Sequence, residues 1–281
     1  MTSHDVVQRV RRGLRTRSAG HTGTLDPFAT GLLVVLLGRA TRLARFVQGE
    51  PKTYVATARL GVKTDTDDLN GRVIGSTVAA TLSEGQLQDA LTGFLGTQQQ
   101  QPPQFSAKHV DGERSYQKAR RGESAVLPDS RVTIHRIELV EYLPPDLTFR
   151  TVVSAGTYVR ALARDLGEQL GVGAHLIRLR REAIGSLRVE DAVSLEALDQ
   201  ASLIPPHRLL SDLPSIVLDE SGRREVAHGR AVRYGGDAGR VPASGWVGSG
   251  AAVALLGDGE LVAVARAEDG WLRPTVVLEA P

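Results

Sequence analysis

The chain has 281 residues, of which 41% are hydrophobic and 23% charged, and its formal net charge is +2. This length fits a main domain with a small second one, and the composition excludes collagen-like repeats, coiled coils and wholesale disorder. No cysteine is present, which excludes disulfides, zinc-thiolate sites, iron–sulfur clusters and a cysteine nucleophile. The longest apolar run, 32–37, is too short to span a membrane, and the arginine-rich start has no apolar core of a secretory signal. We therefore expect a soluble cytoplasmic protein.

Positive charge is concentrated near the N-terminus. Residues 1–60 carry ten basic and three acidic side chains, whereas the rest of the chain is net negative. Only four of the 34 basic residues are lysine. Arginine forks match phosphates bidentately and stack on bases, which favours an RNA-binding surface. An arginine-rich composition with a solvated helix face explains the same charge equally well, so both interpretations stay open on charge alone.

The predicted elements of the first hundred residues follow apolar periodicity. Ser3 is a candidate cap for a short amphipathic helix, and a glycine-rich turn over 20–27 follows it. Asp65 to Gly71 form a polar turn, and Ser83 is a second candidate cap. The predicted regular elements are a buried strand over 32–37, a helix over 40–48, a strand over 54–60 and a helix over 83–95.

In the second half of the chain, the pattern of predicted elements changes at one point. Pro205-Pro206 marks a linker, and beyond it short strands and many glycines indicate a small β-barrel. Before the linker, Pro102-Pro103 keep the preceding segment extended. The predicted regular elements are strands over 131–142 and 147–154, a helix over 157–170 and a short helix over 195–201.

Searches for common chemical motifs fail. The seven histidines are scattered, without the paired spacing of a metal site. The 65–71 turn lacks the pattern of a calcium loop, because its twelfth position is Ser76 rather than glutamate. No phosphate-binding glycine loop and no nucleophile elbow are present. Hydrolase, kinase and dehydrogenase functions therefore lose their usual support.

The turn around Asp26 is unusual on physical grounds. Glycines bracket His21 and Thr22, and Asp26 precedes Pro27. Such a segment forms a rigid turn with an accessible backbone, and a carboxylate fixed next to a buried strand is a candidate nucleophile or base. An Asp-Pro turn whose carboxylate bonds its own backbone is the alternative that these residues leave open.

Motifs in five parts of the chain resemble the TruB family of bacterial tRNA pseudouridine-55 synthases. The first is the run 20–27, followed by Ala29-Thr30-Gly31 and Leu33. The others are Lys52 with Tyr54; Arg59-Leu60-Gly61 with Thr64-Asp65-Thr66-Asp67 and Gly71; Gln101-Pro102-Pro103 with Phe105-Ser106-Ala107; and Gly156-Thr157-Tyr158-Val159-Arg160 with Asp165-Leu166-Gly167, Gly173-Ala174-His175 and Leu179-Arg180-Arg181. The start departs from the family pattern, since Met1 to Asp5 resemble only the end of its lysine-proline-glycine element.

The resemblance implies the conversion of uridine 55 in the tRNA T-loop to pseudouridine, a redox-neutral isomerisation without cofactor or metal. Asp26 matches the essential aspartate, and attack on C1′, attack on C6 and a glycal route remain open. Arg160 matches the arginine that pairs with this aspartate. Tyr54 matches the tyrosine that stacks on the target base and is a candidate for removing the C5 proton. Leu179 matches the apolar residue on the other side of the pocket.

The resemblance also implies base flipping, since a uridine inside a folded loop cannot reach a buried carboxylate without leaving its stack. His21 matches the histidine that fills the space vacated by the flipped bases. The arginines over 9–17 and 39–45 are expected to contact phosphates. The remaining expected substrate-binding residues are Thr24, Lys52, Lys108 and Tyr158.

The implied architecture is an α+β synthase domain over 1–206, with a mixed, largely antiparallel central sheet and flanking helices. A small PUA-like barrel over 207–281 follows it. The expected partner is the tRNA T-arm, with no membrane, no obligatory protein partner and a monomeric enzyme. Two rivals remain open: a guide-RNA-dependent enzyme that modifies ribosomal RNA with partner proteins, and an RNA chaperone that folds tRNA.

Overall fold

The computed structural model describes residues 1–78, 82–105, 109–110, 113–114, 121, 127–233 and 248–279. The chain divides into two compact units. The sheet unit comprises 25–32 and 49–192, and the terminal unit comprises 1–24, 33–48 and 193–281. Each unit has a hydrophobic core of its own. The predicted boundary between residues 206 and 207 stays a prediction.

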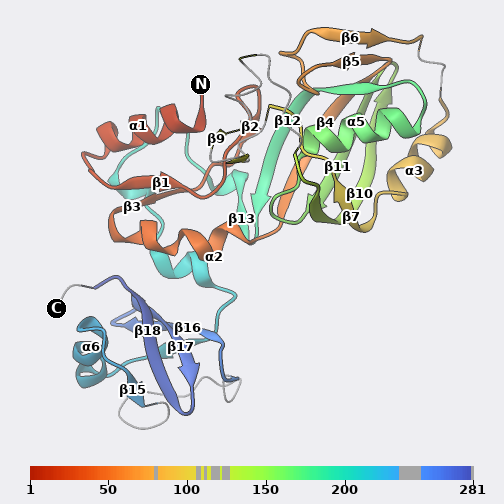
Figure 1. The fold of residues 1–281 in the computed structure, drawn as a ribbon. Helices are drawn as coiled ribbons and strands as arrows, with labels where there is room; N and C mark the ends of the chain where they lie inside the picture. Colours follow the sequence, from red (N-terminus) through yellow and green to blue (C-terminus); the bar gives the residue numbers. More distant parts are fainter. Residues whose placement is uncertain are drawn as a thin grey trace. The chain divides into compact units, whose positions relative to one another are not determined.

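The sheet unit is built on a mixed sheet of seven strands (Figure 1). Its strand order is β13-β12-β4-β11-β10-β7, and all of these neighbours are antiparallel. A short seventh strand, β2, pairs with β12 in parallel. The strands are β2 (Thr30–Gly31), β4 (Lys52–Leu60), β7 (Gly96–Gln100), β10 (Ser130–Leu143), β11 (Asp146–Val153), β12 (Ala174–Ile184) and β13 (Leu187–Arg188). The mixed, largely antiparallel sheet expected from the sequence is confirmed.

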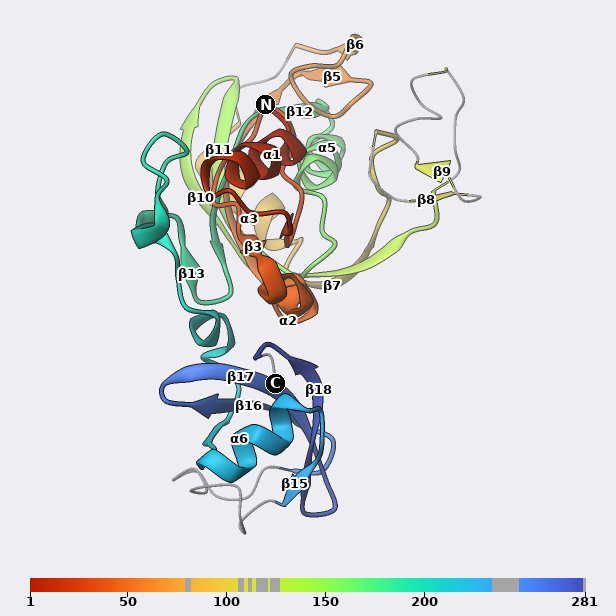
Figure 2. The same cartoon turned by 90° about the vertical axis from the view of Figure 1, so that its left-hand side faces the viewer.

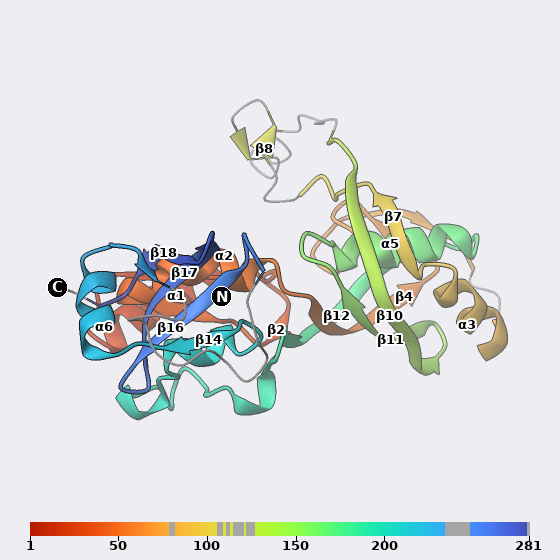
Figure 3. The ribbon, with the colours of Figure 1, turned by 90° about the horizontal axis from the view of Figure 1, so that it is seen from below.

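Two helices cover one face of this sheet. They are α3 (Glu84–Thr92), which packs against β10, and α5 (Val159–Gln169), which packs against β12 and β4 (Figure 1). β10 is the longest strand and runs between β7 and β11 (Figure 3). The smaller paired segments are β5 (Val62–Thr64) with β6 (Val73–Ser76), and β8 (His109–Val110) with β9 (Glu113–Arg114).

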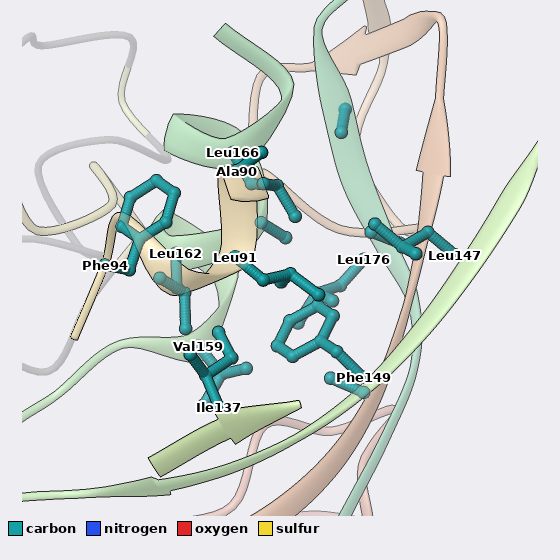
Figure 4. Packing of buried hydrophobic residues seen from close by; sticks show 14 of the residues in the cluster. Ala90, Leu91, Phe94, Ile137, Leu147, Phe149, Val159, Leu162, Leu166 and Leu176 are labelled. Atoms are coloured by element: carbon teal, nitrogen blue, oxygen red, sulfur yellow. The ribbon is translucent and has the colours of Figure 1, made fainter. Parts of the chain in front are cut away.

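The core of the sheet unit lies between the helices and this face of the sheet. Leu91 of α3 and Leu162 and Leu166 of α5 point toward Phe149 and Leu176 of the strands (Figure 4). All five side chains are almost fully buried. The alternation of apolar and polar residues along β11 explains this arrangement, because successive strand side chains point to opposite faces.

The terminal unit combines the N-terminal elements with the C-terminal sheet. Its five-stranded sheet has the order β14-β16-β17-β18-β15, and α6 lies beside it (Figure 2). The N-terminal elements are the helices α1 (Ser3–Gly13), η1 (Gly38–Leu43) and α2 (Ala44–Gln48) and the paired strands β1 (Ala19–His21) and β3 (Val35–Leu37). The C-terminal elements are β14 (Ser215–Val217), α6 (Glu220–Ala227), β15 (Val232–Arg233), β16 (Ala252–Gly257), β17 (Glu260–Glu268) and β18 (Trp271–Val277). Short 3₁₀ turns lie at Val189–Asp191, at Gln200–Ser202 and at Pro206–Leu210.

Three arginines of η1 and α2 contact the C-terminal strand inside the terminal unit. The Arg39 guanidinium donates to the Leu278 carbonyl at 3.0 Å and that of Arg42 to the Val277 carbonyl at 2.8 Å. Arg45 donates to the Thr275 hydroxyl at 3.0 Å. These donors were expected to contact RNA phosphates, and here they satisfy main-chain and hydroxyl acceptors of the protein itself. All three remain exposed, as do Arg9, Arg12, Arg15 and Arg17, so the expected phosphate contacts stay predictions.

Most sequence predictions about elements are confirmed with shifted ends. The strands expected over 54–60, 131–142 and 147–154 are β4, β10 and β11, and the helices expected over 83–95 and 157–170 are α3 and α5. The helix expected over 40–48 is a 3₁₀ turn, η1, that continues into α2.

Three local predictions are corrected. The cap of α1 is Thr2 rather than Ser3, because the Thr2 hydroxyl accepts the Asp5 N–H at 3.2 Å and the Asp5 carboxylate accepts the Thr2 N–H at 2.8 Å. The strand expected over 32–37 is confined to β3. The helix expected over 195–201 is absent, and only a 3₁₀ turn capped by Asp199 follows it. Within the described residues, no helix is long and apolar enough to cross a membrane.

The predicted cap of α3 gives a test of the fold. The Ser83 hydroxyl accepts the Gln86 N–H at 3.3 Å, and the Gln86 side chain accepts the Ser83 N–H at 2.9 Å. Ser83→Ala removes one of these bonds and is expected to lower the free energy of unfolding by about 1 kcal/mol, measured by urea denaturation. The control Gln88→Ala, at an exposed position of the same helix, is expected to change it by less than about 0.5 kcal/mol. Equal effects of the two substitutions would contradict a capping role.

Candidate active site

The loop that carries Asp26 is held against the sheet of its own unit. The Asp26 carbonyl accepts the Ala29 N–H at 2.9 Å, which closes a turn around Pro27. Gly31 then pairs in parallel with Arg181 of β12. Gly31 has φ +98°, and a Cβ there would lie 2.2 Å from the Arg181 carbonyl oxygen. Only glycine fits this approach, so the backbone on the C-terminal side of Asp26 has one fixed path.

Asp26 and Arg160 form a bidentate ion pair. The Arg160 Nε donates to Asp26 Oδ2 at 3.1 Å, and Nη2 donates to Oδ1 at 3.0 Å. The Arg160 side chain is only 5% exposed, whereas that of Asp26 is 29% exposed. Two parallel charge-assisted bonds fix the plane of the carboxylate. The alternative in which Asp26 only bonds its own backbone is therefore wrong.

The remaining donors of Arg160 bind two other segments of the chain. Nη1 donates to the Thr66 carbonyl and Nη2 to the Phe105 carbonyl, both at 2.9 Å. Nη1 also lies 3.6 Å from Asp68 Oδ2. Every nitrogen of this buried guanidinium therefore has a partner, as a buried cation requires. The arginine connects segments that are distant in sequence.

Asp68 is a site residue that sequence reasoning missed. Its side chain is buried and accepts the Thr66 hydroxyl at 2.8 Å and the Asn70 N–H at 2.9 Å. The sequence predicts a polar turn over 65–71 that is also part of a family motif, but it assigns no role to Asp68 itself. Asp68 and Asp26 place two negative charges on one arginine. The sequence feature that could have indicated this pairing is the number of acidic residues in the turn, because buried carboxylates require a cation from another part of the chain.

Arg160 occupies an unfavourable position in its own helix. It lies in the first turn of α5, where the helix dipole disfavours a positive charge. The start of the helix is held instead by Gln100, whose side chain accepts the Tyr158 N–H at 2.9 Å and donates to the Tyr158 carbonyl at 3.1 Å. Tyr158, an expected substrate-binding residue, thus fixes this end through its backbone. The two carboxylates compensate the charge of Arg160.

Tyr54 and Leu179 lie in the same hydrophobic cluster as the Asp26 loop. Both are buried, and Leu25 and Phe28 pack against the cluster that contains them. Tyr54 pairs with Arg181 across β4 and β12. Burial raises the pKa of Tyr54 above its ordinary value, and the Asp26 charge adds to this, while Arg181 opposes it. The sheet unit therefore brings together Asp26, Tyr54, Arg160 and Leu179.

Of the other expected substrate-binding residues, two belong to the terminal unit and one lies outside the described residues. His21 ends β1 and pairs with Val35, and Thr24 is exposed; both belong to the terminal unit. Lys108 lies outside the described residues. Within the described part of the chain, no group of three or more histidine and carboxylate side chains could hold a metal ion.

Lys52 begins β4 and is nearly buried, with its ammonium donating to the Glu50 carbonyl at 2.8 Å. Burial lowers its pKa below the ordinary 10.5, and the Arg181 charge lowers it further, against the opposing charge of Glu50. The folded chain therefore releases this proton more readily than the unfolded chain.

A pH prediction follows from this lowered pKa. As pH rises from the lowered pKa to about 10.5, the free energy of unfolding of the native protein is expected to increase relative to that of Lys52→Met. Urea denaturation of both proteins from pH 7 to 11 measures this difference. A difference that falls with rising pH would contradict the assigned direction.

Comparisons with known proteins identify the family of the chain. The family model for the TruB family pseudouridylate synthase N-terminal domain matches residues 11–159, and that for the tRNA pseudouridylate synthase B C-terminal domain matches 160–218. A tRNA pseudouridine synthase B of Arthrobacter sp. (strain FB24) is 41% identical, over 98% of this chain and 92% of the relative. One from Moorella thermoacetica is 42% identical, over 95% of this chain and 90% of the relative.

Solved structures share the fold at lower identity. A chain in the structure of an H/ACA RNP bound to a substrate RNA containing 2′-deoxyuridine superposes with a TM-score of 0.71 at 23% identity, covering 100% of this chain and 81% of that one. A chain of the archaeal box H/ACA sRNP Nop10-Cbf5 complex gives 0.70 at 24%, covering 100% and 83%. The α+β fold class expected from the sequence is confirmed. The chain therefore belongs to the TruB family of pseudouridylate synthases, which are isomerases.

Proposed function

We propose that this chain converts uridine 55 in the T-loop of tRNA to pseudouridine, as a stand-alone enzyme with Asp26 as its nucleophile. The observation that carries the proposal is the bidentate pair between the partly exposed Asp26 and the buried Arg160. Relatives at 41% and 42% identity are tRNA pseudouridine synthases B, which supports tRNA as the substrate class.

The proposed reaction rearranges one nucleotide without redox change. The N1–C1′ bond of the uridine breaks, the free base rotates, a C5–C1′ bond forms, N1 gains a proton and the C5 proton leaves. Asp26 supports the first step by attack on C1′, by addition to C6 or by assisting a glycal route. Arg160 orients the carboxylate so that one face stays open to the nucleotide, and it spreads the negative charge of the departing carboxylate.

The other residues of the cluster fit the handling of a flipped base. Tyr54 offers a flat aromatic face and a hydroxyl for the C5 proton, and Leu179 offers an apolar wall in the same cluster. Extruding a uridine from its loop costs a few kcal/mol, which contacts to the opened loop must offset. We assign that role to His21, and further RNA contacts to Thr24, Lys108 and the exposed arginines over 9–17.

The substitutions Asp26→Asn and Arg160→Ala test the proposal. Asp26→Asn removes the nucleophile, and Arg160→Ala leaves the carboxylate without its partner. Both are expected to reduce turnover by at least about 10³-fold with RNA binding retained. The assay is tritium release from a C5-tritiated T-arm stem-loop, with filter binding of the same RNA. Glu141→Gln, which changes an exposed carboxylate in β10, serves as the matched control and is expected to keep native activity.

The outcomes also separate the rival functions. A chaperone that folds tRNA keeps its folding effect in Asp26→Asn, whereas isomerisation vanishes. A guide-RNA-dependent enzyme releases no tritium from the isolated stem-loop and modifies it only with a guide RNA and partner proteins. Full turnover by Asp26→Asn would remove this residue from the mechanism and overturn the proposal.

A further inference from the structure

Arg181 is one of the most completely buried side chains in the described part of the protein. It is 1% exposed, and it lies on β12 directly opposite Tyr54 of β4. A buried guanidinium loses the hydration of a full positive charge, so it is retained only where hydrogen bonds and charges compensate that loss. The groups that Arg181 binds therefore indicate why the fold retains a buried cation here.

The first use of Arg181 is to hold the loop that carries Asp26. Its carbonyl accepts the Leu32 N–H, and its Nε donates to the Leu32 carbonyl, both at 2.8 Å. Gly31 lies so close that a Cβ would meet the Arg181 carbonyl at 2.2 Å. Main chain and side chain of one residue thus clamp the end of the loop. This use engages Nε.

The second use concerns Tyr54. The two residues pair directly in neighbouring antiparallel strands, and the Arg181 guanidinium is hydrogen-bonded to the Tyr54 hydroxyl. A hydrogen bond from a cation to a phenol oxygen fixes the direction of that oxygen and stabilises negative charge on it. Because Nε is anchored on Leu32, the donor that reaches Tyr54 has little freedom to move.

We propose that Arg181 is the positioning residue of Tyr54: it holds the phenol oxygen in place and stabilises the phenolate that accepts the C5 proton. The inference rests on the proposed function, in which Tyr54 takes this proton. Tyr54 first loses its own proton to water. In the transfer step the C5–H bond breaks and the proton goes to the phenolate oxygen. The electron pair of this bond forms the C5–C6 double bond, the π pair between C6 and N1 moves onto N1, and N1 takes up a proton from water.

The electrostatics around Tyr54 agree with this role. Burial raises the pKa of Tyr54, and the charge of Asp26 from the neighbouring loop raises it further. Arg181, from β12, acts in the opposite direction through both its charge and its hydrogen bond. Lys52, on the same strand as Tyr54, lies close enough to Arg181 that the two cations disfavour each other, and Arg160 of α5 is bound to Asp26. Arg181 is thus the group that favours the phenolate.

A purely structural role for Arg181 predicts something different. If it only held Gly31 and Leu32, its replacement would lower stability and activity together, without moving the pH dependence of the rate. If it also stabilises the phenolate, its replacement moves the rising limb of the pH profile to higher pH. The pH profile therefore distinguishes the two roles.

The experiment compares Arg181→Met and Arg181→Lys with the native protein. Single-turnover tritium release from the C5-tritiated stem-loop is measured at saturating RNA between pH 6 and 10, alongside thermal unfolding and RNA affinity. Arg181→Met is expected to lose at least about tenfold in rate, with its rising limb displaced upward by at least about one pH unit. Arg181→Lys keeps the charge, so its rate and the position of its rising limb are expected to lie between those of the native protein and of Arg181→Met. Arg178→Met, which alters an exposed arginine of the same strand, is expected to behave as the native protein.

The conservative variant keeps the test decisive if Arg181→Met fails to fold. A folded Arg181→Lys with an unchanged rate and pH profile would overturn the inference. Tyr54→Phe separates this failure from that of the proposed function. If Tyr54→Phe keeps the native rate, Tyr54 is not the proton acceptor and the proposed role of Tyr54 fails. If Tyr54→Phe loses activity while the Arg181 variants keep the native profile, only the inference about Arg181 falls.

Discussion

A guanidinium cannot lose its charge, so a buried arginine requires its neighbours to supply acceptors for every nitrogen. Arg160 imposes this constraint on the sheet unit. Its acceptors come from the Asp26 loop, from the turn at Thr66 and Asp68, and from Phe105. Each acceptor is a fixed carbonyl or a carboxylate that is itself hydrogen-bonded or turn-bound. The position of the candidate nucleophile is therefore determined by the needs of the cation at least as much as by its own loop.

The structure shows that the arginines of this chain have different roles. Arg160 and Arg181 are buried and join loops to the sheet, and Arg42 satisfies a C-terminal carbonyl within the terminal unit. Arg42 is nevertheless exposed, as are Arg9 and Arg17. Regional net charge cannot distinguish these uses, because it counts a buried structural cation and a solvated one alike. The phosphate contacts expected of the arginines over 39–45 therefore stay predictions.

The sequence predicts features that depend on residues close together in the chain, and it fails for features that depend on distant residues. The strands around Tyr54 and the helix capped by Ser83 were predicted correctly, because alternation and caps depend on near neighbours. The helix expected over 195–201 is absent, since seven residues cannot offset the cost of nucleation without a buried face, and most of that segment is exposed. The pairing of Asp68 with Arg160 spans more than ninety residues, and no local pattern encodes it.

The exposed fractions of the site side chains indicate which group a substrate contacts first. Arg160 is 5% exposed, Tyr54 7% and Leu179 5%, whereas the Asp26 side chain retains 29%. The carboxylate is thus the group of this cluster that a solvent-borne molecule reaches first. In the proposed reaction a stacked uridine presents its edge and not its sugar–base bond, so contact with Asp26 requires that the nucleotide leave its stack. The same burial that withholds Tyr54 from water raises its pKa, and a buried cation is the direct means of lowering it again. Burial under the flipped base and a basic oxygen beside it therefore oppose each other in the pKa of Tyr54, and in the proposed role Arg181 is the cation that counters part of the rise.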